Sequence, residues 1–199
     1  SVVSDLFYQG ELQSCISKSE NKILWEGLQQ GLSFELVQHF SNSSESKEEI
    51  DRIEQLVNQL LGCSYQLVQQ NNEGTSVVKG IISPNEILIT APYNLQVNQL
   101  EERLAGKARI GTVDRFQGQE APISIHSLTA SDADNAPRGI GFVLDPDRLN
   151  VAISRAQCLS IVVGSPNLAT GITGTVEGVM QVNRLCRIMD SARQPVSLL

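Results

Sequence analysis

The feature that most constrains the fold is an alternation of short apolar runs with segments of helical periodicity. The runs EILITA (86–91), PISIHSL (122–128) and CLSIVVGS (158–165) have the composition of buried parallel strands. Further strands are expected at 32–37 and in ARIGTV (108–113), a helical turn near 115–118, and helices within 45–61, 95–104, 148–156 and 177–192. Strands alternating with helices predict an α/β fold in which helices cover both faces of a parallel sheet.

The helix predicted over 45–61 has the clearest boundaries. Ser46 and Glu49 have the spacing of a capping box, in which each side chain satisfies a backbone N–H of the other residue. Gly62 marks the end of this helix. Two β-prone runs follow and flank a turn-forming segment, QQNNEGT, so a β-hairpin inserted at 63–82 is expected.

Composition limits the class of protein. The 199 residues are 41% hydrophobic, enough for one sizeable core, so a single domain over 1–199 is expected. No apolar run approaches the roughly 18 to 20 residues that span a bilayer, and the first residues lack a secretion signal, so no membrane partner and a cytoplasmic location are expected. The four cysteines lack metal-ligand spacing, and no metal site is predicted. The net charge of −7 means that any nucleic-acid contact is local or shared with another domain.

Three segments fall where a parallel sheet usually presents functional residues, in loops beyond the carboxyl ends of its strands. They are APYNLQV after EILIT, GTVDRFQGQE after ARI, and RLNVAISRAQ before CLSIVVG. Together they resemble the C-terminal RecA-like motor domain of superfamily 1 helicases, in the branch of the nonsense-decay RNA helicase and the replication nuclease-helicases. GTVDRFQGQE resembles motif V and RLNVAISRA motif VI, while FYQGEL resembles the stretch after motif IV. The residues of APYNLQV and GTVDRFQGQE are most similar to those of bacterial helicases fused to a RecB-like nuclease.

The resemblance implies a P-loop NTPase fold, yet the sequence lacks a P-loop. It holds neither a GxxxxGK[ST] loop nor an acidic Walker B run, the devices that hold phosphates and Mg²⁺. In the family both lie on the first RecA-like domain. We therefore expect half of an ATP site, with ATP and Mg²⁺ held mainly by that first domain of the same polypeptide, and a chain that cannot hydrolyse ATP alone. The sequence leaves open whether a RecB-like nuclease domain is fused to this one as a further partner.

The resemblance also suggests which residues face the nucleotide. Arg155 matches the arginine finger of motif VI, which stabilises charge developing on the γ-phosphate; the alternative is a surface arginine in a salt bridge. Glu120 of motif V would reach the ATP ribose or the γ-phosphate water network, unless it pairs with Arg115 or Arg155. Gly118 suits a close backbone approach or a tight turn. Gln117 is a candidate relay between nucleotide and nucleic acid.

Some residues stay open between function and structure. Arg148 opens motif VI, and it either binds the nucleotide or pairs with Asp145 or Asp147. The two histidines, His39 and His126, stand alone beside or within predicted strands, which favours structural roles.

The predicted nucleic-acid track consists of side chains near strand ends. Asn94, Gln96 and Thr112 have small amide or hydroxyl groups that bond phosphate oxygens without reading sequence. Tyr93 either stacks on a base or packs in the core. Single-stranded nucleic acid is the expected partner, with DNA favoured over RNA. The rival hypothesis is a RecA-like scaffold that has lost its ATP chemistry.

Overall fold

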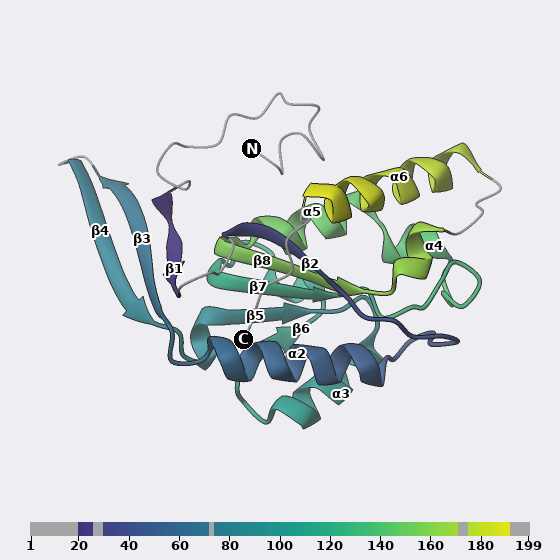
Figure 1. Cartoon of the computed structure of the whole chain (residues 1–199), viewed down its shortest axis with the longest axis horizontal. Helices are drawn as coiled ribbons and strands as arrows, with labels where there is room; N and C mark the ends of the chain where they lie inside the picture. Colours follow the sequence, from purple (N-terminus) through teal and green to yellow (C-terminus); the bar gives the residue numbers. More distant parts are fainter. Residues whose placement is uncertain (1–19, 26–29, 72–73, 171–174, 192–199) are drawn as a thin grey trace.

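A five-stranded parallel sheet carries the fold, in the order β2-β8-β7-β5-β6 (Figure 1). The computed structural model describes residues 20–25, 30–71, 74–170 and 175–191, so FYQGEL lies outside the described residues. The strands are β2 (Gly31–Leu36), β5 (Ile87–Thr90), β6 (Arg109–Gly111), β7 (Ala121–Ser127) and β8 (Ala156–Gly164). All neighbouring strands in this sheet pair in parallel, which confirms the predicted fold class.

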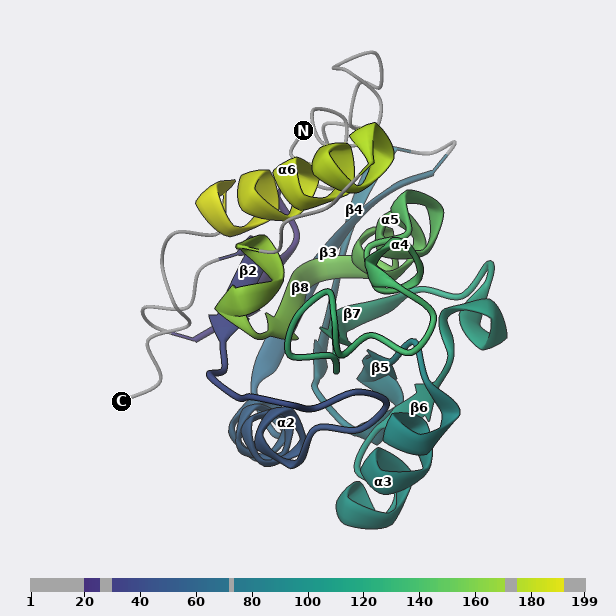
Figure 2. The same ribbon diagram turned by 90° about the vertical axis from the view of Figure 1, so that its right-hand side faces the viewer.

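Helices cover both faces of the sheet (Figure 2). One face carries α2 (Lys47–Leu60) and α3 (Asn94–Leu104), and the other carries α4 (Ile140–Val143), α5 (Pro146–Ser154) and α6 (Val176–Ser191). Short 3-10 turns are η2 (Pro84–Glu86), η3 (Val113–Phe116) and η4 (Pro166–Ala169). The long helices follow the predicted periodicities, whereas α4 forms inside a segment that was expected to be a loop.

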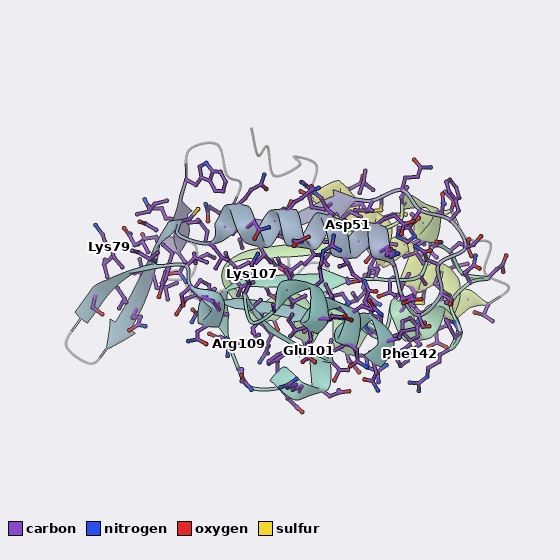
Figure 3. The ribbon with its side chains drawn as sticks, turned by 90° about the horizontal axis from the view of Figure 1, so that it is seen from below. Asp51, Lys79, Glu101, Lys107, Arg109 and Phe142 are labelled. Carbon is purple, nitrogen blue, oxygen red and sulfur yellow. The ribbon has the colours of Figure 1, made fainter. Side chains whose placement is uncertain are left out.

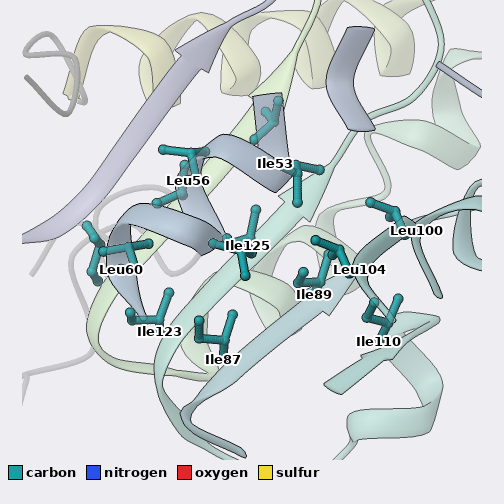
Figure 4. Close-up of a cluster of buried hydrophobic side chains, with 14 of the residues drawn as sticks. Ile53, Leu56, Leu60, Ile87, Ile89, Leu100, Leu104, Ile110, Ile123 and Ile125 are labelled. Atoms are coloured by element: carbon teal, nitrogen blue, oxygen red, sulfur yellow. The ribbon is translucent and has the colours of Figure 1, made fainter. Parts of the chain in front are cut away.

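The two faces of the sheet have different cores. Ile123 and Ile125 of β7 face α2, while Ser124 faces α5 and donates a hydrogen bond to the Ala152 carbonyl at 2.8 Å. The cluster beneath α2 and α3 is almost wholly aliphatic (Figure 4) and includes Ile53, Leu56, Leu60, Ile87, Ile89, Leu100, Leu104 and Ile110. Each such buried side chain contributes about 1.5 to 3 kcal/mol, so this layer holds the sheet's shape.

A second sheet stands at the amino ends of the main strands (Figure 1). Its strands are β1 (Lys22–Leu24), β3 (Ser64–Asn71) and β4 (Gly74–Ile81), paired antiparallel in the order β1-β3-β4. β3 and β4 form a hairpin within 63–82, whereas β1 was not predicted. The Asn21 side chain fastens this sheet to the start of β8: it donates to the Gln157 carbonyl at 3.0 Å and accepts from the Val68 N–H at 2.7 Å.

Only half of the predicted capping box forms at the start of α2. The Ser46 hydroxyl accepts from the Glu49 N–H at 3.3 Å, as expected. The Glu49 carboxylate does not return to Ser46; instead the Gln96 side chain accepts from the Ser46 N–H at 2.8 Å. The reciprocal bond is therefore replaced by one from α3, which ties the two helices together.

Glu49 instead anchors a buried polar network. Its carboxylate accepts from the Thr129 N–H at 3.0 and 3.1 Å, accepts from the Ser127 hydroxyl and lies 2.9 Å from His39 Nε2. His39 Nδ1 in turn lies 2.7 Å from Ser131 Oγ. A carboxylate with no exposed surface needs such donors, because burial without them costs several kcal/mol. His39 is thus structural, as its isolation in the sequence indicated.

The buried His126 makes the stability of the fold depend on pH. Burial lowers the pKa of His126 to about 4, and its Nδ1 lies 2.8 Å from Thr90 Oγ1. The folded protein therefore keeps this imidazole neutral, while the unfolded chain protonates it below about pH 6.5. We expect about 3 kcal/mol of stability to be lost as the pH falls from about 6.5 to about 4.

Urea unfolding across this pH range measures the effect. His126→Asn keeps a polar partner for Thr90 but does not titrate, so its stability should fall less steeply with acid than that of the wild type. All carboxylates are common to both proteins, and their contributions cancel in the difference. Parallel pH profiles would contradict the assignment.

Candidate functional site

The predicted functional residues divide between opposite edges of the sheet. Asn94 and Thr112 follow β5 and β6 at the carboxyl edge, whereas Glu120 and Arg155 directly precede β7 and β8 at the amino edge. In Figure 3 Arg109, the first residue of β6, and Phe142 of α4 lie toward opposite ends of the molecule. All three motifs were expected to lie beyond the carboxyl ends of the strands. This is wrong for the last residues of motifs V and VI, because each of these motifs runs from the carboxyl edge back to the amino edge of the sheet.

At the amino edge, Glu120 and Arg155 stand side by side. The Ala121 N–H donates to the Arg155 carbonyl at 3.0 Å, so the residues preceding β7 and β8 are adjacent. The Gln157 side chain donates to Glu120 Oε2 at 3.2 Å. Glu120 is exposed and Arg155 half-buried. A carboxylate and a guanidinium thus share one surface at this edge.

The Arg155 guanidinium folds back on the end of α5. Its Nε donates to the Val151 carbonyl and its Nη2 to the Ser154 hydroxyl, both at 3.2 Å. Among the described residues no carboxylate lies within ion-pair distance of it, so the salt-bridge alternative is not realised there. Its charge is not compensated by a described carboxylate, and this favours an anionic ligand.

The turn that carries Glu120 is held from the sheet edge. Arg109 Nη1 donates to Gln119 Oε1 at 3.0 Å, and its Nη2 donates to the Glu120 carbonyl at 3.3 Å. Gly118 has a φ of +81°, the conformation that a tight turn requires, with open space where a Cβ would stand. Gln117 is exposed in the same turn.

Neighbouring side chains of motif V have structural partners. Among the described side chains, Arg115 forms an ion pair with Glu101 at 3.2 Å and not with Glu120. Phe116 is buried against Leu88 in a small core cluster. Both residues also line a cavity of about 440 Å³ with Arg109 and Gln119.

At the carboxyl edge, a cavity of about 380 Å³ gathers the predicted track residues. Its lining includes Tyr93, Asn94, Thr112, Arg138, Phe142 and Arg148. Arg148, which was left open between the nucleotide and an ion pair, lies in the first turn of α5, roughly two turns and about 10 Å along the helix from Arg155. Asp145 caps the helix by accepting from the Arg148 N–H at 2.9 Å and forms no ion pair with its guanidinium.

The Tyr93 side chain is mostly buried. It is 8% exposed, and its ring centroid lies 5.4 Å from that of Phe142. Burial raises the pKa of the Tyr93 hydroxyl, although the backbone and the charge of nearby Arg138 act in the opposite direction. Of the two alternatives for Tyr93, the geometry favours packing.

Gln96 does not reach the cavity, so its assignment to the track is wrong. Its side chain is fully buried between α2 and the end of β7. Besides accepting from the Ser46 N–H, it donates to Ser127 Oγ at 3.0 Å and to the Ser46 carbonyl at 3.3 Å. The amide was predicted correctly as a hydrogen-bonding group, but its partners lie inside the fold.

Sequence reasoning also missed residues at both edges. Arg109 stands before motif V, and Arg138 and Phe142 lie between the motifs, so no motif pointed to them. Among the described residues, no cluster of three His, Cys, Asp or Glu side chains is arranged to hold a metal. In the same part of the chain, no helix combines the length and apolarity needed to cross a membrane.

The five-stranded parallel sheet flanked by helices has a RecA-like fold, and the similar proteins show that the domain is of the superfamily 1 helicase kind. The chain belongs to the AAA domain family, which matches residues 1–167. This match covers motifs V and VI as well as both edges of the sheet.

Several helicases are similar to the chain. The Danio rerio protein named "Putative helicase mov-10-B.1" is 31% identical over 194 residues, which cover 83% of this chain and 18% of that protein. The Drosophila melanogaster "Regulator of nonsense transcripts 1 homolog" is 39% identical over 104 residues, 47% of this chain and 9% of that protein. The Drosophila melanogaster "Probable RNA helicase armi" is 37% identical over 95 residues, 44% of this chain and 8% of that protein.

These relatives refine the expected branch. The chain spans less than a fifth of the length of each of them. Their names place the resemblance with the MOV-10 and nonsense-transcript helicases, and they do not support the bacterial branch fused to a RecB-like nuclease. They also do not support a preference for DNA, since one of them is named an RNA helicase.

The burial of Gln96 leads to a stability prediction. Gln96→Met fills a similar volume but leaves the buried Ser46 N–H without an acceptor, which costs about 1 to 3 kcal/mol. We expect that loss in urea unfolding at neutral pH, whereas Asn94→Ala, on the exposed side of the same helix, should change stability by less than about 0.5 kcal/mol. Equal stability of the two variants would contradict a structural role for the buried Gln96 side chain.

Proposed function

We propose that this chain is a motor domain of an ATP-dependent helicase and supplies one side of its ATP site. The observation that carries the proposal is that Glu120 and Arg155 lie next to each other before β7 and β8, while no described carboxylate forms an ion pair with Arg155. ATP would lie against this edge, between the chain and a P-loop domain of the same polypeptide. ATP supplies the phosphoryl group whose transfer drives the motor.

The amino edge has the groups expected for one side of an ATP site, the side opposite the P-loop. Phosphoryl transfer spreads negative charge over the γ-phosphate oxygens, and a guanidinium inserted from a second domain stabilises that charge. Arg155 has the charge and the exposure for this role, and its Nη1 makes no hydrogen bond among the described residues. Glu120 would accept hydrogen bonds from the ribose hydroxyls. Mg²⁺ would be held by the P-loop domain.

The carboxyl edge would bind the nucleic-acid strand. Asn94 is exposed and Thr112 half-buried in the same cavity, and both side chains suit phosphate oxygens rather than base edges. We propose a single strand as the ligand, gripped without sequence preference. The similarity to an RNA helicase favours RNA over the DNA first expected.

The first functional prediction concerns the 199-residue chain by itself. Because its sequence has no P-loop, we expect no ATP turnover above background, with or without single-stranded nucleic acid. A coupled ATPase assay measures this. Turnover that disappears in Arg155→Ala would mean that the chain holds a complete ATP site, and the half-site proposal would be abandoned.

The second prediction concerns the full-length polypeptide that contains this chain. Arg155→Ala should leave the affinity for ATP nearly unchanged and lower kcat about a thousandfold, as expected for a finger acting from a second domain. Arg155→Lys should restore little, because a point charge does not reproduce the planar fork of arginine. Steady-state kinetics at saturating ATP and RNA provide the test.

A matched control is available on a different surface of the chain. Arg103→Lys alters an arginine whose partners, Asp51 and Glu54, lie on α2 away from both edges, and it should leave kcat unchanged. If Arg155→Ala behaves like Arg103→Lys, the rival hypothesis of a RecA-like scaffold gains support.

A further inference from the structure

Two arginines share one aromatic ring at the carboxyl edge. The Arg138 guanidinium carbon lies 3.8 Å from the centroid of the Phe142 ring, and that of Arg148 lies 4.4 Å from it. All three residues line the cavity that also contains Asn94 and Thr112. The Phe142 ring thus gathers two cations that are ten residues apart in the sequence.

The positions of these cations are set by the backbone. Gly139 has a φ of +75°, a conformation that favours glycine, and it turns the chain between Arg138 and α4 so that Arg138 and Phe142 meet. Pro146 and the Asp145 cap fix the first turn of α5, which carries Arg148. The backbone therefore places both arginines beside the Phe142 ring.

Neither guanidinium is neutralised within the described part of the chain. No carboxylate lies within ion-pair distance of either group, and neither donates a hydrogen bond to another described residue. Because both lie over one ring, they are within about one Debye length of each other and repel. Asp114 also lines the cavity without pairing with them. An anion between the two groups would relieve the repulsion.

We propose that Arg138, Phe142 and Arg148 form a clamp for one backbone phosphate of the bound single strand. The inference rests on the proposed function and names new residues for its strand-binding edge. A phosphodiester fits because stacking on the ring orients each planar guanidinium and leaves its N–H groups available for phosphate oxygens. Asn94 and Thr112 in the same cavity would contact the adjoining backbone. The clamp also reassigns Arg148 from the nucleotide to the strand.

The test measures binding of a fluorescein-labelled oligouridine by anisotropy over a salt series, on the 199-residue chain. Arg138→Gln and Arg148→Gln should each weaken binding by roughly tenfold, the effect of losing a charged hydrogen bond. Each should also lower the slope of log K against log salt by about 0.7, the value for one single-strand phosphate. Arg103→Gln, a matched arginine outside the cavity, should change neither quantity.

Lysine variants separate the clamp from simple charge. Arg138→Lys and Arg148→Lys keep the salt slope, but they should still lose affinity because an ammonium does not stack flat and fork onto phosphate oxygens. They also guard against misfolding, since they preserve the charge and the aliphatic stem. Unchanged affinity in the glutamine variants would overturn the clamp and leave the proposed function standing.

Two further outcomes are decisive. If the wild-type chain does not bind the oligouridine at all, both the clamp and the strand-binding edge are wrong, whereas the Arg155 kinetics still test the ATP site separately. Competition with unlabelled oligouridine, excess ATP and inorganic phosphate identifies the source of the anion. Displacement by ATP in preference to oligouridine would mean that these arginines serve the nucleotide, and the proposal would fail.

Discussion

The buried carboxylate of Glu49 is the interaction on which the carboxyl edge depends. It joins the first turn of α2 to the end of β7 through Ser127 and Thr129, and to the segment after β2 through His39. A buried ion tolerates few arrangements, because each lost donor leaves charge without solvation. The path of the chain that leaves β7 is therefore fixed where it begins, and that segment leads to Arg138 and α4. Polar burial here provides orientation rather than net stability.

Placing function at both edges of one sheet separates two kinds of chemistry. The amino edge holds a guanidinium and a carboxylate on adjacent strand starts, while the carboxyl edge holds amide, hydroxyl and guanidinium groups around an aromatic ring. The hydrophobic cluster beneath α2 is almost wholly aliphatic, and Ser124 adds a polar contact on the side of α5. Ligands at the two edges would therefore not touch each other, and any influence between them must pass through the protein.

The sequence predicted the layers of the fold well, because apolar runs and helical periodicity report burial directly. It predicted Ser46 as a helix cap but gave Glu49 the wrong partner, since competing hydrogen-bond donors came from the Thr129 N–H and the His39 ring, which lie outside the helix. Gln96 was misplaced for a related reason: residue type indicates hydrogen-bonding capacity, whereas only the tertiary fold decides which edge or interior a side chain reaches. β1 was missed because three residues carry too little periodicity.

Helix α5 extends from one edge to the other, with Arg148 in its first turn and Arg155 as its C-cap. Its axial hydrogen bonds resist compression, so a displacement at one end is passed to the other as a push or a rotation of the whole helix. If the two proposed ligands bind at these edges, α5 connects them directly. By thermodynamic reciprocity, a strand that draws Arg148 inward and thereby favours one position of Arg155 must itself be bound more tightly when the nucleotide favours that same position.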